Sequence, residues 1–312
     1  MRGILRNRKM IQFFFLFVII GMTFYGLTRR NISNARTGKR TKAVTTLPVT
    51  FSLMTVLSHS ALPEPVYIAA GSDLDAHADY FATQEHLLIP LFKESGLAVS
   101  IQGAWPEDPL YPYARRHNIR IYHIDAAGRL NVGNGQVSQL NDPTAEPAKL
   151  SPYVWHSFRG AIEMADVLAS DLHRINPRRT RRIQRNLDRL RKQLSTSRDE
   201  IGKRYADLDD TRLVALTGDF IYLTDEMNVW VEAYAPPDIN GTDLVALMQE
   251  HKVKLILAKA PMDPAIDAAV TAAGGAIVVL DPILSTEASD AEAYFRRLGE
   301  NHAKLLEAFK NR

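Results

Sequence analysis

The sequence predicts an α/β protein of two lobes, each a parallel sheet flanked by helices, joined by one long rigid helix. Strand-like and helix-like segments alternate on both sides of residues 178–208, which is typical of parallel sheets covered on both faces. Residues 178–208 repeat apolar positions at steps of three, four or seven, and eleven Arg or Lys fall between 178 and 204. This pattern predicts an amphipathic helix about 45 Å long.

The N-terminal lobe is expected to span 48–177. Its strands are short apolar runs bounded by Gly, Pro or polar residues, and they are expected at 47–57, 65–71, 97–103 and 119–125. Helices are expected at 84–96, 109–118 and 151–177, with a loop over 126–150 that is rich in Gly, Asn and Pro.

The C-terminal lobe is expected to span 209–312. The expected strands are 212–218, 253–259 and 276–282. The expected helices are 222–230, 242–252, 264–274 and 287–310, with a loop at 235–241. Ligands of such folds bind at the carboxyl ends of the strands, so strand-end residues are the first candidates for a site.

Residues 1–47 are expected to form a cytoplasmic tip, a transmembrane signal-anchor over about 11–27, and a tether. The run 11–27 is uncharged and apolar, and seventeen helical residues span about 26 Å, enough for the hydrocarbon core of a bilayer. Basic residues lie on both sides, so charge does not settle the orientation. The alternative is a signal peptide cleaved after "SNA" at 33–35. Either interpretation places the body of the protein outside the cytoplasm.

Composition excludes several classes of protein. The chain contains no cysteine, which rules out disulfides, thiolate metal sites and a cysteine nucleophile. The net charge is +3 and the basic residues are local, so no nucleic-acid partner is expected. We interpret the charges of 178–204 as a solvated helix face, or as a docking surface for anionic lipid or a partner.

No enzyme is predicted. "DAH" at 75–77 and "GD" at 218–219 are similar to two blocks of metallophosphoesterases, but Tyr222 occupies a position that requires Asp or Asn, and the remaining block is missing. The chain also lacks G-x-S-x-G, a phosphate-binding glycine loop and H-E-x-x-H.

Four short motifs and the order of elements resemble the zinc/manganese cluster (cluster A-I) of solute-binding proteins of metal ABC transporters. The motifs are "GSDLDAHADY" from 71, "SPYVWHSF" from 151, "TGDFIY" from 217 and "VVLDP" from 278. The resemblance covers about 48–310. It implies a divalent metal between the lobes, delivered to an ABC permease in the membrane.

The resemblance also implies four ligand positions. His77 lies in the first motif, in a loop in that family, and Asp281 lies in the last. Tyr153 and Thr217 stand where the family carries a histidine and a histidine or glutamate. His156 matches no ligand position and is expected to face solvent or to cap the helix.

Zinc prefers about four N, O or S ligands, and two of the four positions are changed, so weak binding of zinc or manganese is expected. Three interpretations remain open. The site uses an altered ligand set, completed by Asp75, Asp79 or Asp219; or it binds ferric iron or a metal complex. In the third, the fold has lost the metal and serves as an accessory or interaction protein. If zinc is bound tightly, the ligands lie elsewhere, and His123 joins these three aspartates as a candidate.

Overall fold

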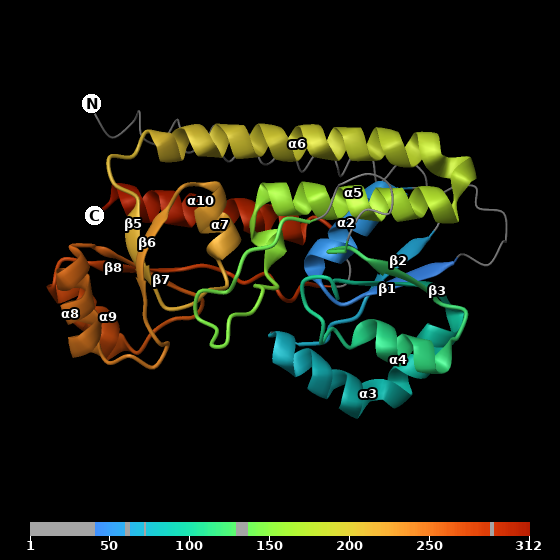
Figure 1. Ribbon diagram of the computed structural model, residues 1–312, viewed down its shortest axis with the longest axis horizontal. Coiled ribbons are helices and arrows are strands. Elements are labelled where there is room, and N and C mark those ends of the chain that lie inside the picture. Colours follow the sequence, from blue (N-terminus) through green and yellow to red (C-terminus); the bar gives the residue numbers. More distant parts are fainter. Residues whose placement is uncertain (1–40, 60–62, 72, 129–136, 288–289) are drawn as a thin grey trace.

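The computed structural model describes residues 41–59, 63–71, 73–128, 137–287 and 290–312. Two parallel sheets of four strands each are flanked by helices (Figure 1). The first sheet has the order β2-β1-β3-β4 and the second β6-β5-β7-β8. The predicted fold class of parallel sheets covered by helices is therefore confirmed.

The first sheet and its helices occupy the first half of the chain. The strands are β1 (Lys42–Thr45), β2 (Glu64–Tyr67), β3 (Ser95–Ser100) and β4 (Tyr122–Asp125). The helices are α2 (Pro48–Ser58), α3 (Leu74–Glu94), α4 (Leu110–His117), the 3₁₀ turn Val154–His156 and α5 (Phe158–Ile175). The helix expected over 151–177 is therefore broken at Ser157, whose hydroxyl caps α5 by accepting from Gly160 N at 2.9 Å.

After the 3₁₀ turn Pro177–Arg179, the long helix α6 (Thr180–Ala206) leads to the second sheet. The strands are β5 (Arg212–Ala215), β6 (Trp230–Tyr234), β7 (Leu255–Ala258) and β8 (Ala276–Val279). The helices are α7 (Ile221–Glu226), α8 (Gly241–His251), α9 (Pro264–Ala272) and α10 (Ala293–Lys310). At about 1.5 Å per residue, α6 is roughly 40 Å long, as its apolar periodicity predicted.

Two expectations for the start of the fold are wrong. Residues 47–57 form helix α2 and not a strand, and Pro48 opens that helix at a position where its missing N–H costs nothing. The edge of the expected tether, Lys42–Thr45, is strand β1 and pairs with both β2 and β3. A short run that is apolar on every face does not distinguish a buried strand from a buried helix.

Two further elements of the second half differ from the expectation. Strand β6 takes up Trp230, the last residue of an expected helix, and the four residues before the expected loop at 235–241, where no strand was predicted. Helix α10 begins at Ala293 and not at 287. Among the described residues, no helix combines the length and apolar character needed to cross a membrane; the anchor expected at 11–27 lies outside them.

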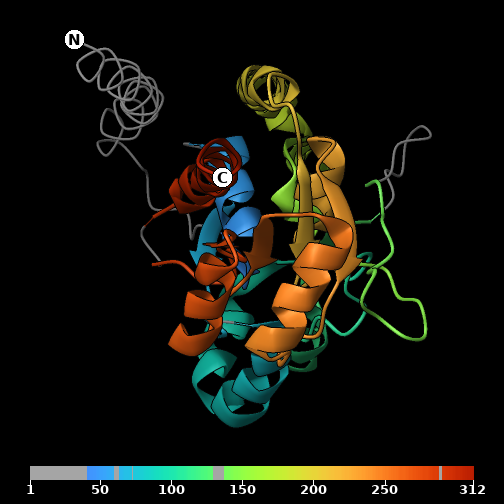
Figure 2. The same ribbon diagram turned by 90° about the vertical axis from the view of Figure 1, so that its left-hand side faces the viewer.

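Three apolar cores hold the molecule together. Helices α3 and α4 pack on one face of the first sheet, and α8 and α9 pack on one face of the second. The opposite faces of both sheets share a single large core with α2, α5, α6 and α10. Figures 1 and 2 show these four helices together on one side of the molecule. Because this core is continuous, it ties the two sheets to each other.

Candidate functional site

The loop that follows β5 carries the centre of the candidate site. The Thr217 hydroxyl donates to Asp219 Oδ1 at 2.6 Å, and Asp219 N donates back to that hydroxyl at 3.2 Å. Lys259 follows the neighbouring strand β7, and its Nζ lies 3.1 Å from Asp219 Oδ2. Adjacent parallel strands end at the same sheet edge, so a buried carboxylate, a hydroxyl and an ammonium group meet there.

A segment of the loop between β4 and α5 lies against this strand end. A Cβ added at Gly218 would lie 2.4 Å from Asp142 Oδ1 and 3.1 Å from Pro143 Cδ, so only glycine permits this approach. The Tyr222 hydroxyl accepts from Leu140 N at 2.9 Å and donates to Ser151 O at 3.1 Å. This hydroxyl thereby fixes both ends of the segment 140–151 to helix α7.

Tyr153 lies beside the same strand end, as the motif resemblance implied. Its ring packs edge-on against Trp155, with centroids 5.2 Å apart, and its hydroxyl interacts with Asp219. Burial raises the pKa of Tyr153 strongly, and the nearby carboxylates of Asp219, Asp142 and Asp75 raise it further. The phenol therefore stays protonated at neutral pH, which makes it a poor metal ligand.

His77 lies in the first turn of α3, and not in a loop as expected. Asp73 caps this helix by accepting from Ala76 N at 2.7 Å. The His77 ring is fully buried and packs edge-on against Trp105, and no hydrogen bond of normal geometry reaches either ring nitrogen. Burial lowers its pKa to about 4, with Asp73 and the Gly71 backbone opposing that shift. The imidazole is thus neutral at pH 7, the form that coordinates a metal.

Asp281 follows β8, and both of its carboxylate oxygens have partners. Oδ1 accepts from Ile283 N at 2.8 Å, and Oδ2 pairs with Arg297 Nε. Asn301 accepts from the backbone N of Asp281 and donates to its carbonyl, at 2.9 and 2.7 Å. Ile283 has φ +52°, which is rare for a β-branched residue. These bonds hold the turn at Asp281 rigidly, and Arg297 neutralises the negative charge of the Asp281 carboxylate.

His156 corrects another expectation, because it neither faces solvent nor caps α5. Its ring is fully buried against Phe220, with centroids 4.8 Å apart. Burial lowers the pKa of His156 to about 3, although Asp281 opposes that shift. The N-terminus of α5 is capped instead by Ser157 and Glu226. The two carboxylate oxygens of Glu226 accept from Phe158 N and Arg159 N at 2.7 Å each.

The structure brings together only some of the predicted site residues. Tyr153 and Thr217 meet around Asp219, whereas the contacts of His77 and Asp281 are with Trp105 and Arg297. His123 is engaged elsewhere, 2.6 Å from the Ser100 hydroxyl and stacked on Tyr111. Asp75 and Asp79 are exposed on α3. In the part of the chain that is described, no three His, Asp or Glu side chains are arranged to hold a metal ion.

An open pocket of about 630 Å³ adjoins Thr217, Asp219 and Lys259. Its remaining walls are mostly apolar and rich in proline: Pro143, Thr144, Leu216, Tyr234, Ala235, Pro236, Pro237, Ala258, Ala260, Pro261 and Met262. Two charged groups that contact predicted site residues were missed in the sequence: Lys259, which lines this pocket, and Arg297, which pairs with Asp281. Lys259 was detectable as a charged residue directly after a strand, whereas no local signal links Arg297 to Asp281.

Solved structures share this fold at low sequence identity. A mutant of FpvC from Pseudomonas aeruginosa matches 87% of this chain and 100% of its own, with a TM-score of 0.72 and 18% identity. A ZnuA structure matches 86% and 99%, with a TM-score of 0.65 and 15% identity. The laminin-binding protein Lbp of Streptococcus pyogenes matches 87% and 100%, with a TM-score of 0.62 and 17% identity.

No curated protein matches the chain. The family described as the zinc-uptake complex component A, periplasmic (ZnuA), matches residues 25–308. That range contains both sheets, the long helix and all four ligand positions named from the motifs. The chain therefore belongs to the ZnuA family, as the four motifs and the order of elements indicated.

Proposed function

We propose that this protein is an extracytoplasmic receptor for metal import by an ABC transporter, and that it carries its metal as a small organic complex. The observation that carries the proposal is the pocket of about 630 Å³ beside the substituted ligand positions Tyr153 and Thr217. Membership of the ZnuA family supports metal receptor activity, and a solved relative, FpvC, is in complex with Mn²⁺.

The ligand chemistry argues against a bare divalent ion. Of the four positions, only His77 offers a free neutral donor, because Tyr153 stays protonated and Asp281 pairs with Arg297. The Thr217 hydroxyl already donates to Asp219. A zinc ion needs about four donors at 2.0–2.3 Å, and this set does not supply them without breaking existing bonds.

The pocket suits a larger ligand. Its volume of about 630 Å³ falls within the range of roughly 300–1,000 Å³ that is typical of small-molecule sites. Its Lys259 ammonium offers a cation to an anionic oxygen donor, and Tyr234 and Met262 offer apolar contact. The best matching class is a metal whose coordination is completed by a chelator with carboxylate, hydroxamate or phenolate oxygens, since His77 does not line this pocket.

The remaining parts of the proposal follow from the sequence. The apolar run 11–27 would anchor the protein in the inner membrane. The two lobes on either side of the linking helix 178–208 would be 48–177, extended at its start by strand β1 (Lys42–Thr45), and 209–312. The receiving partner would be the permease of the transporter. The protein would not be an enzyme, because the family that it belongs to is described as a component of a zinc-uptake complex.

Native mass spectrometry of the full chain, purified from its host without chelators, tests the proposal. We expect an added mass that corresponds to an organic molecule together with a metal. Ala260→Trp should remove it by filling the pocket that Ala260 lines, and Ala272→Trp on the exposed face of α9 should retain it. An added mass of a metal alone would favour a bare-ion receptor, and no added mass would favour a scaffold that has lost its cargo.

A further inference from the structure

One end of the molecule carries a concentrated positive charge that the transport function does not use. Between residues 172 and 198 the chain has ten Arg or Lys and one acid, Asp188. Near the start of this stretch Arg174 pairs with Asp171 at 3.2 Å, and four further arginines are exposed: Arg178, Arg179, Arg181 and Arg185. No carboxylate of the described part of the chain pairs with any of these four, unlike Arg191, which binds Asp166 at 2.7 Å.

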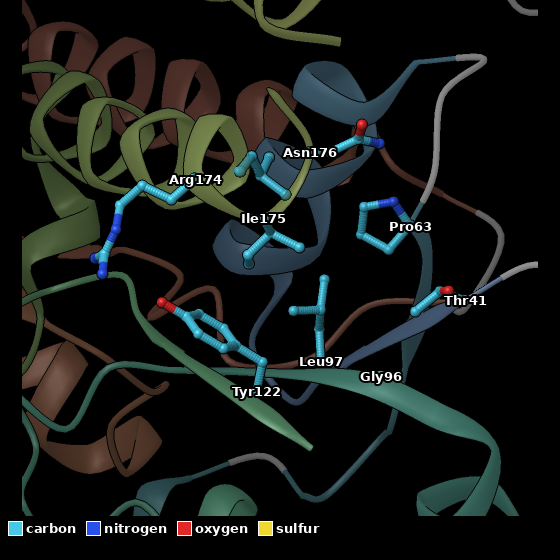
Figure 3. A pocket seen from close by; sticks show the side chains of 9 residues that line it. Thr41, Pro63, Gly96, Leu97, Tyr122, Arg174, Ile175 and Asn176 are labelled. Atoms are coloured by element: carbon cyan, nitrogen blue, oxygen red, sulfur yellow. The ribbon is translucent and has the colours of Figure 1, made fainter. Parts of the chain in front are cut away.

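Apolar side chains are exposed beside these arginines. Ile175 at the end of α5 is 38% exposed, and Tyr122 at the start of β4 is 39% exposed. Both line an open pocket of about 520 Å³ together with Arg174 and Thr41 (Figure 3). Ile119, three residues before Tyr122, is 74% exposed. We call this surface the amino-end patch: Arg178, Arg179, Arg181, Arg185, Ile119, Tyr122 and Ile175.

The chain that precedes the described fold attaches at this same patch. Thr41, the first described residue, lines the pocket, and Figure 1 shows the start of β1, the end of α5 and the start of α6 at one end of the molecule. Residues 28–40 lie between the apolar run and Thr41 and include five Arg or Lys. Thirteen residues reach at most about 45 Å when fully extended.

We propose that the amino-end patch docks on the anionic phospholipid surface of the membrane that holds residues 11–27. Arginines bind lipid phosphates, and exposed Ile and Tyr side chains enter the headgroup region. The inference rests on the membrane anchor of the proposed function. A tether of thirteen residues keeps this end close to the bilayer, so the bilayer is the nearest extended anionic surface available to these arginines.

Docking in this way would set the orientation of the receptor. The pocket at Thr217, Asp219 and Lys259 lies at the carboxyl ends of the second sheet, whereas the patch lies at the amino ends of the first. The two surfaces share no lining residue. The cargo pocket therefore stays free while the patch rests on lipid.

The test measures how close each end of the full chain lies to lipid in reconstituted vesicles. The chain has no cysteine, so Glu64→Cys at the start of β2 and Ala272→Cys in α9 each give one labelling position. Energy transfer from the label to a dye on the lipid headgroups is compared between zwitterionic vesicles and vesicles with about one anionic lipid in three. We expect anionic lipid to raise transfer from position 64 and to leave position 272 unchanged.

Neutralising the patch identifies its arginines as the cause. Each basic residue near an anionic surface contributes roughly a fivefold factor, so Arg178, Arg179, Arg181 and Arg185 changed together to Gln should lower the docked-to-undocked ratio several-hundred-fold. Salt at about 1 M, where the Debye length is roughly 3 Å, should also lower the docked-to-undocked ratio of the unchanged protein. A control with the same loss of charge replaces the exposed Lys203, Lys254, Lys304 and Lys310 with Gln and should remain docked.

Three results would overturn the inference. Transfer from position 64 could be independent of anionic lipid, the control could lose docking as fully as the patch variant, or the full chain could fail to stay with either kind of vesicle. None of these readouts involves metal or the cargo pocket. The cargo proposal is tested separately by native mass spectrometry, so the failure of one proposal is distinguishable from the failure of the other.

Discussion

Restoring the missing histidines should convert this pocket into a zinc site. The change is Tyr153→His together with Thr217→His, which supplies imidazoles at the two substituted positions. A complete zinc site is worth on the order of 10 kcal/mol, or about 2.5 kcal/mol for each of four ligands. Two restored ligands should therefore strengthen zinc binding by about 5 kcal/mol, a factor of several thousand.

Arg297 limits this gain, because Asp281 must leave it to bind zinc. A hydrogen bond to a charged group contributes about 1.5–3 kcal/mol. Adding Arg297→Gln to the double variant should therefore strengthen binding by a further tenfold or more. The same substitution in the wild-type chain should have little effect, since two ligands would still be missing.

Calorimetric titration with zinc measures the affinity, and the melting temperature with zinc checks that binding stabilises the folded state. The matched control is Tyr153→Phe with Thr217→Val, which removes both hydroxyls and adds no donor. If the double histidine variant gains less than about tenfold over wild type, against the several-thousand-fold gain expected, the four side chains do not converge on one point. Our assignment of Tyr153 and Thr217 to ligand positions would then be wrong.

Three further predictions concern the fold. Tyr222→Phe removes the hydroxyl that bridges Leu140 N and Ser151 O, so urea denaturation should show a loss of about 1–3 kcal/mol, while Tyr122→Phe should show almost none. Burial raises the pKa of Asp108 to about 6, so the folded state holds this proton more tightly than the unfolded chain. The free energy of unfolding should thus fall by up to about 3 kcal/mol as pH rises from about 4 to 6, and Asp108→Asn should flatten that slope. The continuous core and the unbroken α6 should keep the radius of gyration constant on ligand binding, and a marked shrinkage in small-angle scattering would refute the rigid connection.

The parts of the fold that could be predicted from sequence are those in which apolar and polar residues alternate in a clear pattern. The long helix α6 shows its apolar stripe in the sequence, and strand ends such as the one before Thr217 are marked by a change to polar residues. Helix α2 could not be distinguished from a strand because nearly all of its residues are buried. The burial of His156 also escaped prediction, since it depends on Phe220 and other residues distant in sequence.

The candidate site was predictable in position but only partly in chemistry. The motifs located His77, Tyr153, Thr217 and Asp281, but the pairing of Asp281 with Arg297 depends on how α10 packs beside β8. Local sequence does not encode such long-range contacts. The raised pKa of Tyr153 likewise depends on burial and on carboxylates from three separate segments.

Titration of the wild-type full chain with zinc alone tests the central claim, that the remaining ligands do not hold a bare divalent ion. His77 and Asp281 together should supply at most about 5 kcal/mol, which corresponds to a Kd of roughly 0.2 mM, and the Arg297 pair should weaken it further. We predict a Kd of about 0.2 mM or weaker, with the remaining binding lost in His77→Ala. Zinc binding at nanomolar concentration, lost in His77→Ala and in Asp281→Ala, would contradict the account.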